Sequence, residues 1–363
     1  MPTLGLVVNP IAGMGGRVAL RGTDGPEALR QARARGAVPL AGERARRALA
    51  RLPRETRVVA APGAMGADVA ESAGLRYETT GEARVSWSDG GPAARGVAET
   101  TAADTWAAAA EMRARGVDLL LFAGGDGTAR DIHDAIGADL PLVGVPTGVK
   151  MHSGVFAATP DAAGLAAAGF LRGADEVQLA DIADVDEDAA REDRVATRLY
   201  GEARIPRAPR HILAAKAASP AVDAGLQSLC EAFRWLPGLT LLGPGTTTAR
   251  ILKGTLLGVD ALEDGELVAT DLDEQQLLQL EADRLIIGVV GGQGSLLGRG
   301  NQQLSPRVLR NIRELTIVAA ADKLVHLDCL RVDTGDDELD RQLSGYTRVH
   351  TAPGRTMVMK VST

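Results

Sequence analysis

The residues most able to do chemistry in this chain form the turn GGDG, residues 124–127. Gly124, Gly125 and Gly127 can adopt backbone angles closed to other residues, and their N–H groups can approach phosphate oxygens closely. Asp126 stands out in such a turn, because a carboxylate repels phosphate unless it binds a metal ion or accepts a proton from an attacking hydroxyl. The turn therefore indicates a phosphate site with a candidate catalytic residue.

The residues on either side of this turn indicate a strand before it and a helix after it. Residues 117–123 are almost all apolar, which is typical of a short strand buried on both faces. Ile132, Ala135 and Ile136 then recur at helical spacing. Such a helix points the positive end of its dipole toward a bound phosphate. A plain strand-to-helix connection, with Asp126 near the helix cap, explains the same residues and stays open as an alternative.

The pentapeptide GGDGT, residues 124–128, resembles the signature shared by NAD kinases, diacylglycerol kinases and sphingosine kinases. Three further segments match in the same order along the chain. Residues 3–16 resemble the Asn-Pro opening of the lipid-kinase branch, and residues 140–157 stand where these kinases carry a glycine-rich loop. Residues 241–251 resemble a threonine-rich segment that lies near the nucleotide in NAD kinases. The resemblance therefore extends over most of the chain.

The sequences of residues 13–25 and 148–157 most resemble those of the ATP-NAD kinase-like group that includes AcoX proteins. The resemblance implies that Asp126 is the catalytic base for the acceptor hydroxyl. Asn9 could bind a phosphate or, as part of a turn-forming Asn-Pro pair, could fix the first loop. The residues implied in nucleotide or phosphate binding are Asn9, Gly13, Gly15, Gly124, Gly125, Gly127, Thr128, Gly245, Thr246, Thr247 and Thr248.

The resemblance makes NAD the leading acceptor, although the chain differs from NAD kinases at one place. NAD kinases carry an Asn-Glu pair just after the central loop that helps hold the dinucleotide, and residues 148–199 contain no such pair. An acidic run at residues 181–188 occupies the corresponding region. It could hold magnesium or a polyhydroxylated acceptor, or it could be a solvated turn. The candidate acceptor contacts are Lys150, His152, Asp184, Asp186 and Glu187.

Apolar runs at residues 4–8, 57–61, 117–123 and 140–145 alternate with helical stretches. One of these stretches, residues 98–115, has the pattern of a helix that covers a sheet. This alternation indicates an α/β domain with a parallel sheet, because parallel strands require crossover connections.

The pattern changes from about residue 175, where short β-rich runs are separated by Gly and Asp turns. We therefore expect an α/β domain over residues 1–174 and a mainly β domain over residues 175–317. The resemblance implies that the end of the chain, residues 318–363, returns to pack on the first domain.

Composition excludes several classes of function. The 363 residues carry a net charge of −7, which argues against general nucleic-acid binding. Cys230 and Cys329 lie far apart and form no metal-binding or disulfide pattern, so we expect a cytoplasmic protein. No apolar run is long enough to span a membrane. Residues 13–18 lack the third glycine of a dinucleotide fingerprint, which argues against a Rossmann dehydrogenase.

The sequence thus predicts a magnesium-dependent kinase that transfers the terminal phosphoryl group of ATP, or of polyphosphate, to the hydroxyl of a small molecule. NAD is the acceptor that the resemblance favours, and another nucleoside, sugar or polyol is the competing enzyme hypothesis. A nucleotide-sensing or accessory protein without turnover is the alternative from a different class. The resemblance also implies a homodimer or a larger homo-oligomer.

Overall fold

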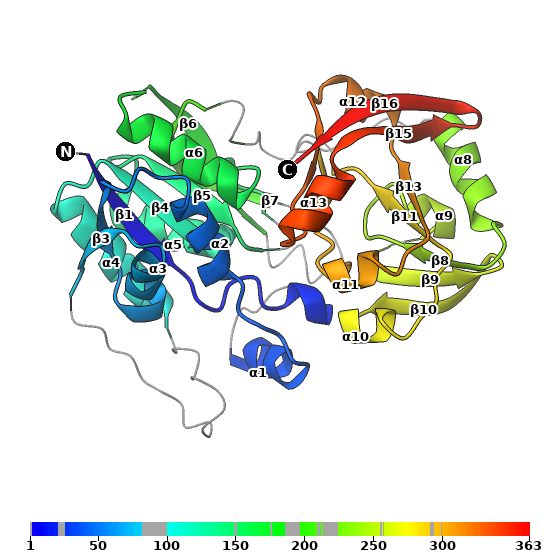
Figure 1. Ribbon diagram of the computed structural model, residues 1–363, viewed down its shortest axis with the longest axis horizontal. Coiled ribbons are helices and arrows are strands. Elements are labelled where there is room, and N and C mark those ends of the chain that lie inside the picture. The colour runs from blue at the N-terminus through cyan, green and yellow to red at the C-terminus, as the bar shows by residue number, and fades with distance from the viewer. Residues whose placement is uncertain are drawn as a thin grey trace. The chain divides into compact units, whose positions relative to one another are not determined.

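The computed structural model describes residues 2–20, 26–81, 100–148, 151–174, 176–185, 197–208, 212, 224–254, 256, 258–290, 294–298 and 300–363. The chain divides into two compact units (Figure 1). Unit 1 comprises Met1–Met14 and Val38–Ala215, and unit 2 comprises Gly15–Ala37 and Lys216–Thr363. The glycine-rich loop near the N-terminus is therefore divided, with Gly13 in unit 1 and Gly15 in unit 2.

Unit 1 is built on a five-stranded parallel sheet with the order β3-β2-β1-β4-β5. All six residues of β4 and all five of β5 are buried, as expected for strands covered on both faces. The parallel α/β domain predicted from the apolar runs is thus confirmed. The strands are β1 (Thr3–Val8), β2 (Arg57–Ala60), β3 (Arg76–Thr79), β4 (Leu119–Gly124) and β5 (Leu142–Pro146).

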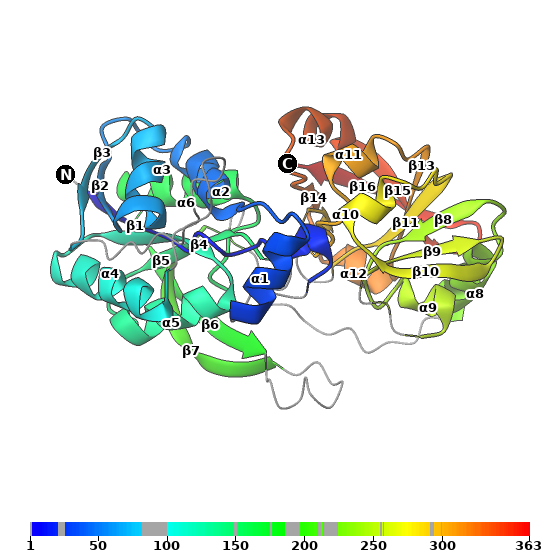
Figure 2. The ribbon, with the colours of Figure 1, turned by 90° about the horizontal axis from the view of Figure 1, so that it is seen from below.

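Helices cover both faces of this sheet (Figure 2). On one face lie α2 (Ala41–Leu49), α3 (Ala67–Ser72) and α6 (Pro160–Leu171). The other face is covered by α4 (Ala102–Ala114) and α5 (Asp126–Ile136). The predicted helix over residues 98–115 corresponds to α4, which begins at a capping box formed by Thr101 and Asp104.

An antiparallel hairpin completes unit 1. It consists of β6 (Val177–Val185) and β7 (Thr197–Pro206), and it packs on α5 and β5. Ile182, Ala203 and Ile205 are buried in the core of unit 1. The boundary expected after residue 174 therefore differs from the observed one, because these apolar side chains tie the hairpin to the α/β unit.

Unit 2 contains a nine-stranded mixed sheet with the order β10-β9-β8-β11-β13-β15-β16-β14-β12. Alternate residues of its central strands face two separate apolar clusters, as the period of a strand requires. The strands are β8 (Leu239–Leu242), β9 (Val259–Glu263), β10 (Glu266–Leu272), β11 (Arg284–Gly288), β12 (Ser295–Leu297), β13 (Glu314–Val318), β14 (Leu330–Val332), β15 (Gly345–Ala352) and β16 (Arg355–Ser362). A mainly β second domain is thus confirmed.

Short helices connect the strands of unit 2, and the N-terminal segment of this unit is helical as well. The helices are η1 (Gly16–Val18), α1 (Pro26–Ala34), α8 (Ala224–Arg234), α9 (Ala249–Leu252), α10 (Glu274–Leu277), α11 (Pro306–Leu309), α12 (Ala321–Val325) and α13 (Asp337–Leu343). The side chain of Gln302 packs so closely on Gly16 that any Cβ at Gly16 would overlap it. This contact explains a glycine in η1.

The end of the chain forms part of the sheet of unit 2. Strand β15 pairs with β13 and β16, and β16 pairs with β14. Residues 318–363 thus belong to unit 2, and the expectation that they pack on the first domain stays a prediction. The backbone hydrogen bonds of these strands are made within the second sheet.

Candidate functional site

The candidate catalytic residue Asp126 is the first residue of α5 and lies directly beyond the carboxyl end of β4. The residue is 7% exposed. The carboxylate accepts hydrogen bonds from three groups of the loop that follows β5. The His152 N–H donates to Oδ2 at 2.7 Å, and the N–H and hydroxyl of Ser153 donate to Oδ1 at 3.0 and 2.7 Å. Asp126 thus holds the loop against the start of α5.

Burial is the largest influence on the ionisation of Asp126 and raises its pKa above the ordinary value. The hydrogen bonds from Ser153 and His152, together with the nearby His152 imidazole, favour the charged form and lower the pKa by less. Each carboxylate oxygen can accept about two hydrogen bonds. Oδ1 already accepts two, whereas Oδ2 accepts the one from His152. Oδ2 is therefore the atom with room to accept a proton.

Ser153 was missed in the sequence analysis, although it follows His152 directly. Its hydroxyl oxygen lies 2.7 Å from Asp126 Oδ1 and accepts the Ala183 N–H at 3.0 Å. The Ala183 carbonyl oxygen lies 2.9 Å from the same hydroxyl. Because Ala183 belongs to β6, Ser153 connects the candidate catalytic carboxylate to the hairpin. The only sequence signal was its position in the central loop.

The three glycines of the GGDG turn have different structural roles. None of Gly124, Gly125 and Gly127 has a positive φ, so this turn does not use the backbone angles that glycine alone can adopt readily. A Cβ at Gly124 would lie 2.5 Å from the Thr128 Cβ, so the packing of Thr128 requires a glycine there. A Cβ at Gly125 or Gly127 would meet nothing within 4 Å. These two glycines leave open space above the start of α5, as close approach of a phosphate requires.

Asn9 follows β1 and fixes the first loop to the GGDGT segment. Its Nδ2 donates to the Thr128 Oγ1 at 3.0 Å, and its Oδ1 accepts the Ile11 N–H at 3.2 Å. Nearby, Gly13 has φ +79°, and a Cβ there would lie 2.1 Å from the Thr147 carbonyl oxygen. These contacts support the loop-fixing interpretation of Asn9. The carboxyl ends of β1, β4 and β5 thus bring Asn9, Asp126 and His152 to one edge of the sheet.

The threonine-rich segment lies in unit 2, between β8 and α9. Thr246 is exposed, whereas Thr247 and Thr248 are buried. The Thr248 hydroxyl lies 2.6 Å from the Gly243 carbonyl oxygen and 3.1 Å from that of Gly245, so it stabilises the turn. Gly245 has φ +149° and opens the turn. Among the three threonines, Thr246 is the one with an exposed side chain for a ligand.

Lys323 lies beside this turn and was also missed in the sequence analysis. It belongs to α12, and its Nζ lies 3.4 Å from the Thr247 Oγ1. Strands β8, β11 and β13 run parallel, so the turn at residues 243–248 and the start of α12 lie at the same edge of the sheet. This edge combines glycines, an exposed hydroxyl and a cation. The arrangement can bind an anion on unit 2.

Several predicted contacts lie outside the described residues. These are Lys150, Asp186 and Glu187, and the side chain of Asp184 is also outside the described part of the structure. Gly15 is described and caps η1 in unit 2. Among the described residues, no group of three or more His, Cys, Asp or Glu side chains is placed to hold a metal ion. No helix in the described ranges is long and apolar enough to cross a membrane.

Two protein-family models match the chain, and their boundaries differ from those of the two units, since the first match includes residues 15–37 and ends before the hairpin. The model of the ATP-NAD kinase N-terminal domain matches residues 4–174, and the model of the ATP-NAD kinase C-terminal domain matches residues 245–361. The first match contains Asn9 and Asp126, and the second contains Thr246 and Lys323. Searches of curated proteins and of solved structures found no match.

Proposed function

This chain belongs to the ATP-NAD kinase family, and we propose that it transfers the terminal phosphoryl group of ATP to the hydroxyl of a small-molecule acceptor. Family membership implies a phosphotransferase with a hydroxyl acceptor. NAD is the acceptor that the family favours. Polyphosphate is the competing donor, because a site that binds phosphates through glycines and a helix terminus recognises a chain of phosphates in either molecule.

The observation that carries this proposal is the state of Asp126. It is a buried carboxylate with a raised pKa, one free acceptor position on Oδ2, and open space above the neighbouring Gly125 and Gly127. As general base, Oδ2 accepts the proton of the acceptor hydroxyl. The hydroxyl oxygen forms a bond to the terminal phosphorus, and the bond from that phosphorus to the ADP oxygen breaks. ADP leaves with the electron pair of that bond.

Groups that suit a bound phosphate occur in each unit, taken by itself. In unit 1 the amino terminus of α5 presents free N–H groups and the positive end of the helix dipole. In unit 2 Lys323 adds a positive charge beside the exposed Thr246. Magnesium is bound in proteins by few carboxylates together with phosphates and water, so we propose that it enters as the Mg–ATP substrate. It then neutralises charge on the phosphates.

One observation favours an acceptor other than NAD. The Asn-Glu pair that helps NAD kinases hold the dinucleotide is missing between residues 148 and 199. A nucleoside, sugar or polyol kinase is therefore the second candidate, and the same base would serve each of these hydroxyls. A nucleotide sensor would bind ATP through the same glycines without consuming it. A homodimer or larger assembly stays a prediction for either candidate.

The test is a product assay with the full chain. The protein is incubated with Mg–ATP or polyphosphate and a panel of NAD, NADH, nucleosides, sugars and polyols, and products are identified by mass spectrometry. The comparison variants are Asp126→Asn, which cannot accept the proton, and Asp139→Asn, which makes the same change at an exposed position. We expect a phosphorylated product that Asp126→Asn fails to form and Asp139→Asn forms normally. ATP binding without any product would contradict the kinase and favour the sensor.

A further inference from the structure

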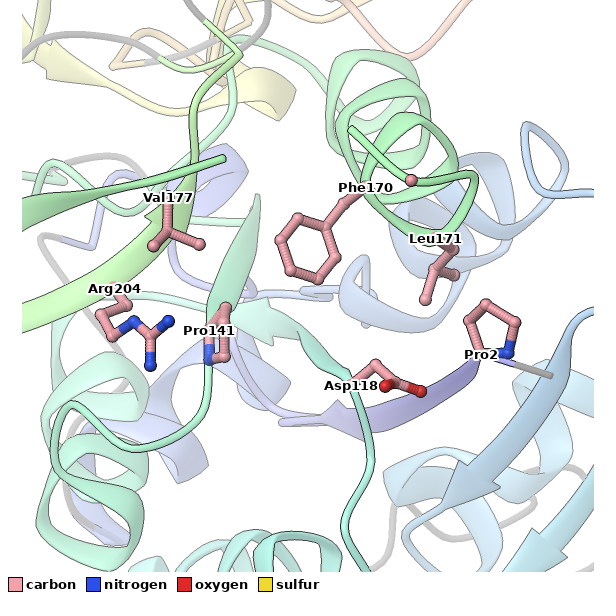
Figure 3. A pocket seen from close by; sticks show the side chains of 8 residues that line it. Pro2, Asp118, Pro141, Phe170, Leu171, Val177 and Arg204 are labelled. Atoms are coloured by element: carbon pink, nitrogen blue, oxygen red, sulfur yellow. The ribbon is translucent and has the colours of Figure 1, made fainter. Parts of the chain in front are cut away.

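A pocket of about 400 Å³ lies in unit 1 at the edge of the sheet opposite to Asp126 (Figure 3). Asp118 and Pro141, two of its lining residues, directly precede β4 and β5. Asp126 follows β4 at its other end. The six residues of β4 span about 20 Å at the rise of a strand, so the pocket is separate from the candidate catalytic residue.

Most of the residues that line this pocket are apolar. Phe170 and Leu171 come from the end of α6, and Val177 comes from the start of β6. Figure 3 shows the Phe170 ring projecting between Val177 and Leu171. Pockets of this volume, with apolar walls and a few polar groups, are typical of small-molecule sites. The apolar surface calls for a ligand with a hydrophobic or aromatic body.

Arg204 supplies the positive charge in this pocket. It lies on β7 opposite Leu179 and is half-buried. Its guanidinium forms no hydrogen bond or ion pair with the residues that the structure describes. A half-buried guanidinium without a partner is costly, and its planar arrangement of donors matches the two oxygens of a carboxylate or phosphate. Arg204 therefore indicates an anionic group in the ligand.

The charge of Asp118 favours a carboxylate over a phosphate as the anionic group of the ligand. Its Oδ2 accepts the Thr3 N–H at 2.6 Å, and its Oδ1 accepts no hydrogen bond from the described residues. The negative charge of Asp118 in the pocket lining disfavours a phosphate dianion more than a carboxylate, because the repulsion grows with the charge of the ligand. The free Oδ1 also offers an acceptor to an ammonium group.

We propose that this pocket binds a small carboxylic acid with an apolar or aromatic body. The carboxylate pairs with Arg204, and the body packs on Phe170 and Leu171. In an amino acid, the ammonium group pairs with Asp118. The proposal does not depend on the kinase reaction, since none of these residues belongs to the candidate catalytic site.

Calorimetric titration of the full chain with three matched compounds tests the ligand class. The first compound, 3-phenylpropionate, carries the carboxylate alone, and phenethylamine carries the amine alone. The third, L-phenylalanine, carries both groups. We expect both acids to bind with a dissociation constant of about 1 mM or tighter, and the amine to bind at least about tenfold more weakly. No binding by either acid, or equal binding by the amine, would overturn the proposal.

Variants of the pocket test the individual contacts. Arg204→Gln should weaken the binding of both acids about tenfold or more. Arg204→Lys keeps the charge but loses the two-point geometry, and it should weaken their binding less. Arg172→Gln is the matched control, because Arg172 is exposed and does not line the pocket. Asp118→Asn should weaken the binding of L-phenylalanine and should not weaken the binding of 3-phenylpropionate. Loss of binding in the Arg172 control, or retention in Arg204→Gln, would contradict the assignment.

Competition with nucleotide separates this site from the kinase site. The acids should bind equally well with saturating Mg–ATP present, and Asp126→Asn should bind them as the parent does. Displacement by ATP would place the acids at the kinase site and overturn the proposal. A protein that binds the acids but transfers no phosphoryl group would contradict the proposed function alone.

Discussion

The Ser153 hydroxyl lies 2.7 Å from the Asp126 carboxylate and connects it to strand β6. The same hydroxyl has two acceptors within reach, Asp126 Oδ1 and the Ala183 carbonyl oxygen, but only one hydrogen to donate. Its hydrogen bond to Asp126 stabilises the ionised carboxylate, whereas burial destabilises it. Ser153 is thus a positioning residue that also tunes the candidate base.

Replacing Ser153 tests this role. Ser153→Ala removes a hydrogen bond that favours the charged form, so the pKa of Asp126 should rise further. The acidic limb of the profile of kcat/KM against pH should then move to higher pH. Ser153→Thr keeps the hydroxyl and should restore the parent profile. A profile that keeps its position in Ser153→Ala while the activity falls would indicate a purely structural role.

The parent protein should itself show an elevated acidic limb. Asp126 accepts a proton only when it is ionised, so activity is lost as the pH falls through its pKa in the folded protein. Burial raises that pKa, and the loss should therefore occur above the ordinary aspartate value of about 3.9. Measurement of kcat/KM from pH 4 to 9, with unfolding followed in parallel, checks this. Full activity down to about pH 4 in a folded sample would contradict it.

The glycines of the turn should respond differently to alanine. Gly124→Ala forces a Cβ to within 2.5 Å of Thr128 and should lower the free energy of unfolding by about 1–3 kcal/mol. Gly127→Ala meets open space within α5 and should keep or raise stability by up to about 1 kcal/mol. Its methyl group should nevertheless raise the KM for ATP, because it occupies space that a phosphate needs.

Denaturant unfolding and ATP kinetics on the same samples separate these two effects. Gly125→Ala serves as a second variant of the open type, since its φ of −112° is accessible to alanine. Unchanged ATP kinetics in both Gly125→Ala and Gly127→Ala would argue that the open space is not the phosphate site.

Lys323 should contribute to nucleotide binding through its charge. Lys323→Met keeps much of the aliphatic side chain and removes the ammonium beside Thr247, so the KM for ATP should rise about tenfold with little change in stability. The effect should shrink at high salt if the contact is exposed to solvent. Lys360→Met, at an exposed position of β16, is the matched control. Equal changes in both variants would exclude a specific role for Lys323.

Local sequence patterns were sufficient to predict the strand, turn and helix at the centre of the candidate site. The apolar run of β4, the glycine-rich turn and the helical spacing of Ile132 and Ile136 are all short-range features, and the structure contains the strand, turn and helix that they predict. The same holds for β1, β2 and β5. The periodicity of a strand or a helix extends over about ten residues, so it can be recognised without knowing what packs against the element.

Contacts between residues far apart in the sequence determined the features that local patterns did not predict. The hairpin belongs to unit 1 because Ile182 and Ile205 enter its core, and residues 15–37 belong to unit 2 although they follow β1. Gly124 is required by the side chain of Thr128, a contact that backbone propensity does not reveal. Ser153 reaches Asp126 across 27 positions, and Lys323 reaches Thr247 across 76. Sequence periodicity contains no information on such pairs, because folding alone brings them together.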